Sequence, residues 1–490
     1  MKVIKLIEQN RIIFWLILSF LFAITVQQFP FYKGNSLHLL HAIKNFGFNK
    51  LQNDWIANTT NHLPLFTIFN HFLIKFFSLK ILHLIHFCLL SLCSLFLFLI
   101  CKTQFKELKN PFLSLVWFSL FIIIYHENSL FGGVAGQDVI NEGYQPASFG
   151  VLFFVGIYLF LINKNFLSIL FICLAASFHP TYVLHSGFLL LGICLYYIFK
   201  KEYAQTFKLS IIYIILILPI TLYILLNFFF IDKNLILEGQ KILLDRAVHH
   251  AVIQSWFSYK DLLSIMVYII SLIIVFKEKK FFIPFLVLGF ISIIFSFIQF
   301  FLENNSLALS FPWRSSVFLV PISTMIILSF FMQNFFAKKK YIKVFSIILI
   351  FFSVSTFLVK NHFIENSNKN FYKKMELINK IKENYVNIDR LLIPVSLEDV
   401  RMNIGLPIFV DWKHPPFKFN EIIEWKRRMN LTTSFFSTEN FDQKIVILNE
   451  IDKIENISHL LINKKDLINN CKDLIDDTKY SLISKEDCYQ

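Results

Sequence analysis

Long apolar runs alternate with short polar segments along most of the chain. A helix needs about 20 apolar residues to cross the hydrocarbon core of a bilayer. Runs that reach or approach this length fall at residues 12–29, 81–101, 111–126, 146–162, 166–179, 181–199, 209–230, 263–276, 281–301, 316–334 and 344–360. The pattern predicts a mainly α-helical polytopic membrane protein with about 11 transmembrane helices.

One further apolar run, at 64–77, is interrupted by Asn70, His71 and Lys75. We interpret it as a helix that lies along the membrane interface rather than across the membrane. It belongs to a large first outer loop, residues 31–80, in which residues 36–46 also have a helical pattern. The first outer loop is therefore expected to carry interfacial helices.

The distribution of Lys and Arg predicts the orientation. With the N-terminus in the cytoplasm, the inner segments carry 17 Lys and Arg, whereas the much longer outer segments before the tail carry 10. Such an excess on the inner side is the positive-inside bias of membrane proteins. Counting 64–77 as a span would invert every later loop. The tail, residues 361–490, is therefore expected on the outer side.

The tail alternates β-type runs with amphipathic helical patterns. Strands are expected at 391–395, 408–411, 458–463 and 479–484, and helices at 370–385, 397–404, 418–429, 440–452 and 465–475. Alternation of this kind predicts a small α/β domain. The sequence thus divides into a transmembrane domain, 1–360, and a periplasmic α/β domain, 361–490.

Composition agrees with a membrane protein. The 490 residues are 56% hydrophobic and only 16% charged. The net charge of +14 is spread in short clusters between apolar runs, so we interpret it as a topology signal and expect membrane lipid, not nucleic acid, as the partner. No obligate protein partner is evident. Of the cysteines, only Cys471 and Cys488 lie outside the spans, and an oxidising outer compartment predicts a disulfide between them.

Unusual polar residues collect in the outer loops. Those of the first loop and the later loops are Asp54, Trp55, His62, Gln137, Asp138, Glu142, His179, Arg246 and Arg314. The inner loops are short and carry little besides lysines. A one-sided collection of ionisable groups predicts a site at the outer interface.

The second outer loop, FGGVAGQDVINEGYQPASFG at 131–150, combines glycines with carboxylates. Glycines let the backbone turn tightly or approach a ligand closely. Asp138 and Glu142 are four residues apart, and their mutual repulsion would be relieved by a divalent cation or a substrate hydroxyl. A solvated pair of loop carboxylates is the alternative. We expect the loop to fold over the first outer loop and bring Asp138 close to Asp54.

Two arginines, Arg246 and Arg314, lie where a lipid phosphate would sit. A guanidinium matches phosphate with two parallel hydrogen bonds. In the tail, the candidate substrate-binding residues Arg401, Asp411 and Lys413 surround a predicted strand end, where ligand groups gather in α/β layers. A structural turn fixed by the prolines that follow is the alternative reading of this segment.

The whole layout resembles the GT-C superfamily of membrane glycosyltransferases. The strings NDWIANTTNHLP, FHPTY and VDWKHPPF also look like those of an uncharacterised group of bacterial multi-pass membrane proteins. The resemblance implies a polyprenyl-phosphate sugar donor and a catalytic carboxylate in an outer loop, for which Asp54, Asp138 and Glu142 are the candidates. Residues 31–50 contain no Asp or Glu, where the superfamily usually has an acidic residue, so Asp54 is the first candidate along the chain.

The sequence therefore predicts a glycosyltransferase that acts at the outer face of a bacterial inner membrane, with its metal requirement open. Two alternatives remain, namely a transporter or flippase of a lipid-linked or anionic solute, and a non-enzymatic envelope assembly protein. A transporter typically places ionisable residues near the middle of its spans. Here they lie at the span ends, which favours the enzyme.

Overall fold

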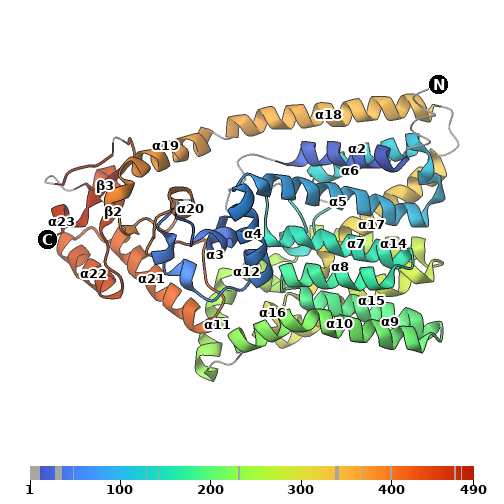
Figure 1. The fold of residues 1–490 in the computed structure, drawn as a ribbon, viewed down its shortest axis with the longest axis horizontal. Helices are drawn as coiled ribbons and strands as arrows, with labels where there is room; N and C mark the ends of the chain where they lie inside the picture. The colour runs from blue at the N-terminus through green and yellow to red at the C-terminus, as the bar shows by residue number, and fades with distance from the viewer. Residues whose placement is uncertain are drawn as a thin grey trace. The chain divides into compact units, whose positions relative to one another are not determined.

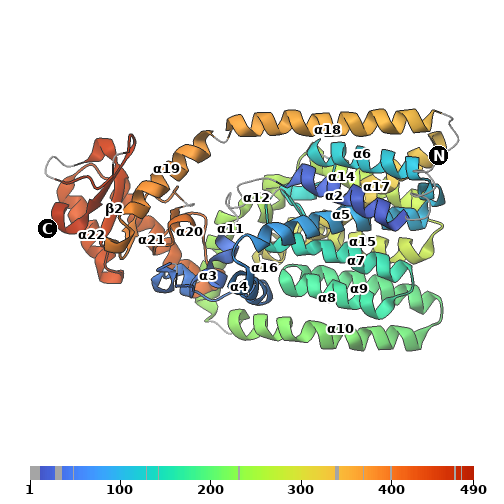
Figure 2. The ribbon, with the colours of Figure 1, turned by 45° about the horizontal axis from the view of Figure 1, so that its top comes forward.

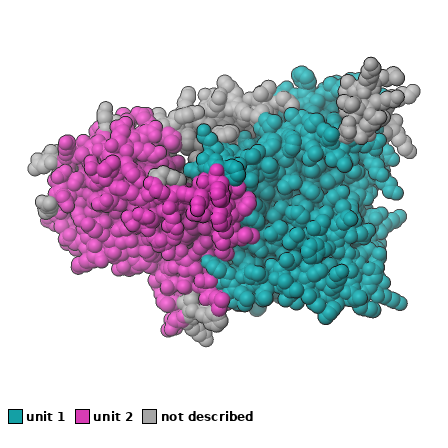
Figure 3. All heavy atoms as spheres, in the orientation of Figure 1, with its two compact units in different colours: residues 1–31, 77–225, 244–361 teal, residues 32–76, 226–243, 362–490 magenta. Residues whose placement is uncertain are grey.

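The computed structural model describes residues 11–27, 36–47, 49–127, 130–141, 143–229, 232–336, 341–367, 369–397, 400–467, 471–475 and 477–489. The chain is mostly helical and divides into two compact units (Figure 3). Unit 1 comprises residues 1–31, 77–225 and 244–361, and unit 2 comprises residues 32–76, 226–243 and 362–490. The first outer loop thus belongs to the same unit as the tail.

Unit 1 is a set of helices that lie side by side (Figure 1). Its longer helices are α2 (Arg11–Val26), α5 (Ile81–Gln104), α6 (Pro111–Glu127), α7 (Val151–Leu161), α8 (Asn165–Phe178), α9 (Tyr182–Phe199), α10 (Tyr203–Ile224), α14 (Tyr259–Val275), α15 (Lys279–Leu302), α17 (Ser316–Phe335) and α18 (Ile342–Ser367), which ends in unit 2. Its shorter α-helices are α12 (Val248–Ala251), α13 (Ile253–Trp256) and α16 (Asn305–Leu309). Its 3₁₀ turns are η4 (Lys106–Lys109), η5 (Val134–Gly136), η6 (Pro146–Gly150) and η8 (Pro312–Ser315). A π turn, η7 (Leu225–Phe229), lies where the chain passes from unit 1 into a segment of unit 2. Each predicted apolar run overlaps one of the longer helices.

Five stretches are long and apolar enough to cross a membrane, among the residues that the structure describes. They are Ile81–Gln104, Tyr182–Phe199, Tyr203–Phe229, Lys279–Leu302 and Asn305–Phe335. Helix α10 lies along one edge of unit 1 (Figure 2) and exposes a row of apolar side chains that includes Phe207, Ile214 and Ile215. A membrane protein is therefore supported, whereas the count of 11 spans stays a prediction.

Small and hydroxylated residues hold the helices of unit 1 together. A Cβ placed on Gly192 of α9 would come within 2.5 Å of the Cα of Pro284 on α15, so only glycine allows this approach. Ser271 donates a hydrogen bond of 2.8 Å to Ser323 across α14 and α17. Close backbones and interhelical hydroxyl bonds are typical of helices packed in lipid, where apolar contact alone does not favour association.

Unit 2 combines short helices with a small sheet. Its helices are α3 (Leu40–Ile43), α4 (Pro64–Phe77), most of α11 (Lys233–Arg246), α19 (Lys369–Glu383), α20 (Val400–Ile404), α21 (Phe419–Ser437), α22 (Phe441–Ile454) and α23 (Lys485–Cys488), with 3₁₀ turns η1 (Ser36–Leu39), η2 (Leu51–Asn53), η3 (Ile56–Asn58), η9 (Tyr385–Asn387) and η10 (Lys464–Asp466). The strands are β1 (Leu391–Leu392), β2 (His459–Asn463) and β3 (Tyr480–Ser484). The three strands lie in the order β1-β2-β3.

The sheet is mixed. Strand β1 runs parallel to β2 with Leu391 opposite His459, and β2 runs antiparallel to β3 with Leu461 opposite Leu482. Leu391, Leu461 and Leu482 are fully buried in the core of the tail. The sheet gives the tail a hydrophobic core of its own, as expected for a small α/β domain.

Three details of the tail differ from the sequence prediction. The strand predicted at 391–395 is limited to the two residues of β1. The predicted strand at 408–411 is reduced to a single bridge between Ile408 and Leu391. The helix predicted at 465–475 is wrong, because the described part of this segment holds only the turn η10 and then an extended stretch. There the Leu474 N–H donates to the carbonyl of Leu482, 2.8 Å away, so pairing with β3 replaces the helical hydrogen bonds. The strands predicted at 458–463 and 479–484 are confirmed as β2 and β3.

Helix α4 is the predicted interfacial helix. It has 14 residues, which is too short to cross a bilayer. It buries Phe66 and Ile74, while Ile68, Phe72 and Phe76 form an exposed apolar row at intervals of one helical turn. An exposed apolar row is the property by which a helix binds the interface.

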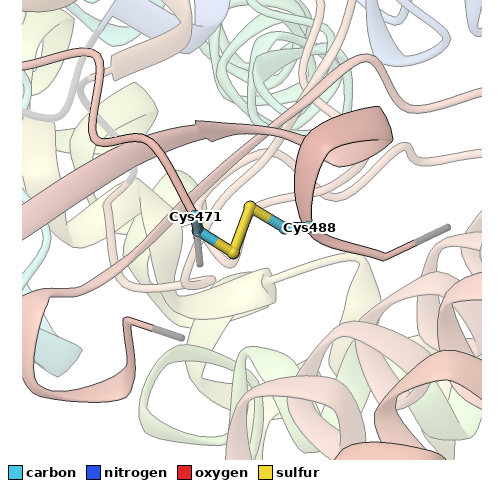
Figure 4. The surroundings of a disulfide bond; sticks show 2 residues. All are labelled: Cys471 and Cys488. Atoms are coloured by element: carbon cyan, nitrogen blue, oxygen red, sulfur yellow. A yellow bond between two sulfur atoms is a disulfide. The ribbon is translucent and has the colours of Figure 1, made fainter. Parts of the chain in front are cut away.

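The predicted disulfide is confirmed. Cys471 and Cys488 are joined, with their Cα atoms 5.3 Å apart (Figure 4). The bond ties the segment before β3 to α23 after it, so it closes a loop around one edge strand of the sheet.

We predict that changing both cysteines to serine weakens the tail by about 3 kcal/mol, because the unfolded chain regains the freedom of the closed loop. Hydrogen exchange of peptides from 458–489 in urea would measure this loss in the full-length protein. The matched control is Cys88→Ser, which removes an exposed, unpaired thiol of α5 and is expected to cost less than about 0.5 kcal/mol. An unchanged urea midpoint after reduction would contradict the prediction.

Candidate functional site

Hydrogen bonds from neighbouring helices hold the second outer loop in unit 1. The Thr324 hydroxyl donates to the carbonyl of Leu130 at 2.6 Å. The Tyr125 hydroxyl donates to the carbonyl of Ile140 at 3.1 Å. The described part of this loop is therefore built into the helical unit and does not behave as a free surface loop.

A strained turn lies at the centre of the loop. Ala135 and Gly136 have φ values of 58° and 61°, in the left-handed region. For a residue other than glycine this backbone costs on the order of 1–3 kcal/mol. The Ala135 N–H donates to Asp261 at 3.0 Å, and its carbonyl accepts from His250 Nδ1 at 2.9 Å. Side chains thus hold both backbone groups of Ala135 and stabilise its conformation.

Close approach explains a second glycine. A Cβ on Gly133 would lie 2.6 Å from the Ser316 hydroxyl at the start of α17. The same hydroxyl accepts the Val134 N–H at 3.0 Å, and the Gly133 N–H donates to the carbonyl of Gln137 at 2.7 Å. The glycines therefore serve a tight turn against a helix, and the turn sets the direction of Gln137.

Three candidate residues from three different outer loops meet beside this turn. Arg314 of η8 donates from Nε to Gln137 Oε1 at 3.2 Å and from Nη1 to the Thr181 hydroxyl at 2.8 Å. That hydroxyl also lies 2.6 Å from Nδ1 of His179. We call Gln137, His179, Thr181 and Arg314 the Arg314 cluster.

One buried donor of the cluster has no partner among the described residues. Gln137 is only 5% exposed, and its Nε2 has no partner among the described residues. Arg314 is half-buried, and no described carboxylate lies within 4.0 Å of it. Burying a cation or an amide donor without a partner is costly. The arrangement is therefore suited to an anion with several acceptor oxygens.

Further polar groups lie close to the cluster. Tyr182, which is buried at the start of α9, is within electrostatic range of both Arg314 and Asp138. Its hydroxyl donates to the carbonyl of Ala147 at 3.2 Å. His185, about one turn further along α9, is fully buried and also within range of Arg314. Asp138 is half-buried, and it shares with Arg314 an electrostatic effect on Tyr182.

The other outer-loop candidates of unit 1 are less central. Arg246 is the last residue of α11. His250 holds the Ala135 turn, and burial, with His249 nearby, lowers the pKa of its imidazole. Glu142 lies outside the described residues.

Unit 2 contains a different arginine site, in which two carboxylates lie within ion-pair distance of the guanidinium. Arg401 is completely buried between two carboxylates that are also completely buried. Its Nε lies 3.0 Å from Asp54 Oδ2, and its Nη1 lies 2.8 Å from Asp411 Oδ2. We call Asp54, Arg401, Asp411 and His414 the Arg401 network.

Asp54 has no room for a substrate. Oδ1 accepts the Ala57 N–H and Oδ2 accepts the Ile408 N–H, each at 3.0 Å, in addition to the contact with Arg401. The carboxylate therefore joins the first outer loop to the tail. This geometry supports a structural role for Asp54 and gives no support to its predicted role as a base.

Asp411 is equally engaged. Its Oδ1 accepts the backbone N–H groups of Lys413 and His414 and also contacts His414 Nδ1. Burial alone would raise the pKa of the Asp411 carboxyl, but Arg401 and His414 outweigh it and lower the pKa. The segment is thus a turn built around Asp411, which agrees with the structural alternative; of the three candidates Arg401, Asp411 and Lys413, only Lys413 is partly exposed.

Other contacts strengthen the junction of loop and tail. The Trp55 ring lies 4.1 Å from the guanidinium carbon of Arg428, a cation–π contact. The Thr60 N–H and hydroxyl donate to Glu421 at 2.9 and 2.8 Å. Trp55 therefore stacks on the tail. His62 of the same loop packs on Phe417.

The comparisons bear on this same part of the tail. A family described as a domain of unknown function, DUF6798, matches residues 373–432. No curated protein matches the chain. The matched segment contains Arg401, Asp411 and His414, so it coincides with the tail's share of the Arg401 network. The match assigns no activity.

The candidates fall into two separate groups. Asp138, Gln137, His179 and Arg314 belong to unit 1, whereas Asp54 belongs to unit 2. The expected approach of Asp138 to Asp54 therefore stays a prediction. Within the described ranges no group of three or more His, Cys, Asp or Glu is arranged to hold a metal ion.

Sequence reasoning missed several of the residues that matter. Thr181 links Arg314 to His179, and it follows His179 and Pro180 in the string FHPTY, in which only His179 was predicted as a site residue. Arg428 and Glu421 bind the first outer loop across a long stretch of chain. The residue pattern within one segment does not indicate which distant segment its side chains will contact.

We predict that Asp54→Asn destabilises unit 2 by about 3–5 kcal/mol, because the ion pair with Arg401 is lost and the amide NH₂ group faces buried N–H donors where Asp54 has an accepting oxygen. Urea unfolding of the full-length protein, followed by hydrogen exchange of the tail, would measure this. The control is Arg427→Gln, which removes an exposed ion pair with Glu424 and is expected to cost less than about 1 kcal/mol. A variant with normal stability but lost activity would instead restore Asp54 as a base.

Proposed function

We propose that the protein transfers a sugar from a polyprenyl-phosphate donor to an acceptor hydroxyl, and that the Arg314 cluster binds the phosphate of the donor. The observation that carries the proposal is the half-buried Arg314 guanidinium, which has no carboxylate partner among the described residues and stands beside the unpaired Nε2 of Gln137. A phosphate would supply the missing acceptors, since guanidinium and amide N–H groups both donate to phosphate oxygens.

The proposed reaction places the negative charge where the donors are. The acceptor oxygen forms a bond to the anomeric carbon of the sugar, and the bond from that carbon to the phosphate oxygen breaks. The polyprenyl phosphate leaves with the bonding electron pair, so its charge changes from about −1 to −2. Fixed donors such as Arg314 and Gln137 bind the departing group more tightly than the substrate, which lowers the barrier.

Asp138 is the proposed base. The proton of the acceptor hydroxyl would pass to its carboxylate as the new bond forms. Asp138 stands with Arg314 near Tyr182, whereas the contacts of Asp54 are all structural. Glu142, four residues further along, remains a second candidate because it lies outside the described residues.

The proposed setting is a bacterial inner membrane. We propose 11 spans, a cytoplasmic N-terminus and a periplasmic tail, since each apolar run overlaps a helix and Lys and Arg are concentrated on one side. In this topology the Arg314 cluster and Asp138 lie on the outer side, because all of them come from outer loops. A lipid donor would then enter the site from the outer half of the bilayer.

We predict that Arg314→Gln lowers sugar transfer by about 100- to 1000-fold, the usual effect of removing one donor that stabilises transition-state charge. Release of polyprenyl phosphate from a panel of synthetic polyprenyl-phosphate hexoses, by the purified protein in vesicles, would measure transfer. Arg314→Lys keeps the charge but loses the two-pronged geometry, and is expected to fall between wild type and Arg314→Gln.

The variant Asp138→Asn distinguishes the proposed base from the proposed phosphate-binding residues. It is expected to lower transfer by a similar factor while binding of the donor stays close to that of wild type, whereas Arg314→Gln weakens both. Arg427→Gln on the surface of the tail is the control with unchanged activity. Release of polyprenyl phosphate by Arg314→Gln at the wild-type rate would overturn the proposal. Passage of the intact donor across the vesicle membrane, with no release, would favour a flippase.

The topology gives its own prediction. A phosphatase reporter fused after Lys360 should be active, because such reporters fold only in the oxidising outer compartment. A fusion in the inner segment at 200–208 should be inactive and provides the matched control. The reverse pattern would show that the chain is inverted, and activity at both points would reduce the number of spans.

A further inference from the structure

Three histidines of unit 2 gather around one small cavity. His38 of η1, His41 of α3 and His62 line it together with Thr60 and Pro415. The space has room for about one water molecule. The ring centroids of His38 and His62 are 6.2 Å apart, so charge on both rings would be repulsive.

The cavity lies where the first outer loop contacts the tail. The three histidines come from the loop, and Pro415 and Pro416 come from the tail. His62 also packs on Phe417, with ring centroids 3.9 Å apart. These contacts require compact, uncharged rings, because a charged imidazole at the same place would have to keep its hydration.

The surrounding charges do not favour a protonated ring. Burial, reinforced by Lys44, lowers the pKa of His41 to about 4. Burial, and then His38 and His41, lower the pKa of His62 well below its ordinary value. Carboxylates that could compensate are already engaged, since Glu421 is held by Thr60 and Asp411 by Arg401.

The remaining titratable groups beside the cavity, His71 and His414, do not place a negative charge near the three histidines. His71 of α4 donates from Nδ1 to the carbonyl of Ala42, which follows His41. His414, which precedes Pro415, is bound to Asp411. The charged and titratable groups that line the cavity or adjoin its lining include His38, His41, Lys44, Asp54, His62, His71, Asp411, His414 and Glu421, and Asp54 is engaged by Ala57, Ile408 and Arg401.

We propose that His38, His41 and His62 form an acid-sensitive latch, which closes the first outer loop on the tail at neutral pH and opens that contact when the rings become protonated. The latch regulates the junction inside unit 2 and does not depend on the proposed transferase activity. Its input would be the pH of the compartment that the tail faces.

The direction in which pH shifts the latch follows from the pKa of histidine in the open form and in the closed form. An exposed histidine in the open form titrates near pH 6.5, whereas His41 in the closed form has a pKa of about 4. The closed form is therefore fully stable above about pH 6.5 and loses stability as the pH falls from about 6.5 to 4. Between pH 7 and 5 the open population is expected to rise about twentyfold from His41 alone.

Hydrogen exchange of the full-length protein at pH 7 and pH 5 would test the latch. Peptides covering 36–63 should lose about twentyfold in protection after correction for the intrinsic pH dependence of exchange. The double variant His41→Gln/His62→Gln has no titratable ring at these two positions and should lose most of this pH dependence. His249→Gln, at an exposed histidine of unit 1, is the matched control and should behave as wild type.

A second measurement covers the case in which the double variant does not fold. Exchange of the imidazole C2 hydrogen in the wild-type protein reports the titration of each ring separately. It should place His41 at least about 1.5 pH units below an exposed histidine. Ordinary titration of His41 and His62, or protection of 36–63 that is the same at both pH values, would overturn the proposal.

Discussion

The organisation of unit 2 depends on one buried cation. Arg401 is completely buried, and such a charge is tolerated only where anions and acceptors surround it. Asp54 arrives from the first outer loop, Asp411 from the turn after Ile408, and the Ile408 carbonyl accepts from Nη2 at 3.0 Å. Removing Arg401 would leave the Asp54 and Asp411 carboxylates buried without this cation. The network therefore holds the first outer loop in the conformation that fits the turn at Asp411. The contacts of Trp55 and Thr60 with the tail depend on this arrangement.

Arg314 presents the opposite situation. It is also held by side chains from distant loops, but these are neutral, namely Gln137 and Thr181. Neutral acceptors orient a guanidinium without satisfying its charge. Arg401 thus has anionic partners within the folded chain, whereas no described carboxylate lies within 4.0 Å of Arg314. This difference, rather than the residue type, is what makes the Arg314 cluster the better candidate for binding and the Arg401 network the better candidate for structure.

Local patterns predicted much of the fold. The apolar runs located the long helices of unit 1, and the alternating runs at 458–463 and 479–484 located β2 and β3. The helix predicted at 465–475 failed because Leu474 pairs with Leu482, a contact that no local pattern records. The same limit applies to the site. The sequence suggested Gln137, His179 and Arg314 separately from their outer position, yet it gave no means to know that Thr181 connects them or that Arg401 and the backbone occupy Asp54.

The location of Asp54 also bears on where any base must be. Both of its oxygens accept backbone N–H groups, and one of them also contacts Arg401. To take a proton from an acceptor, Asp54 would have to leave these partners, and Arg401 would remain buried against Asp411 alone. A residue on which the folding of a unit depends is poorly placed to change its charge in every catalytic cycle. The turn before Asp138 is held through backbone groups of Ala135 and Gly133. A catalytic carboxylate, if the protein is a transferase, is therefore to be sought in the second outer loop.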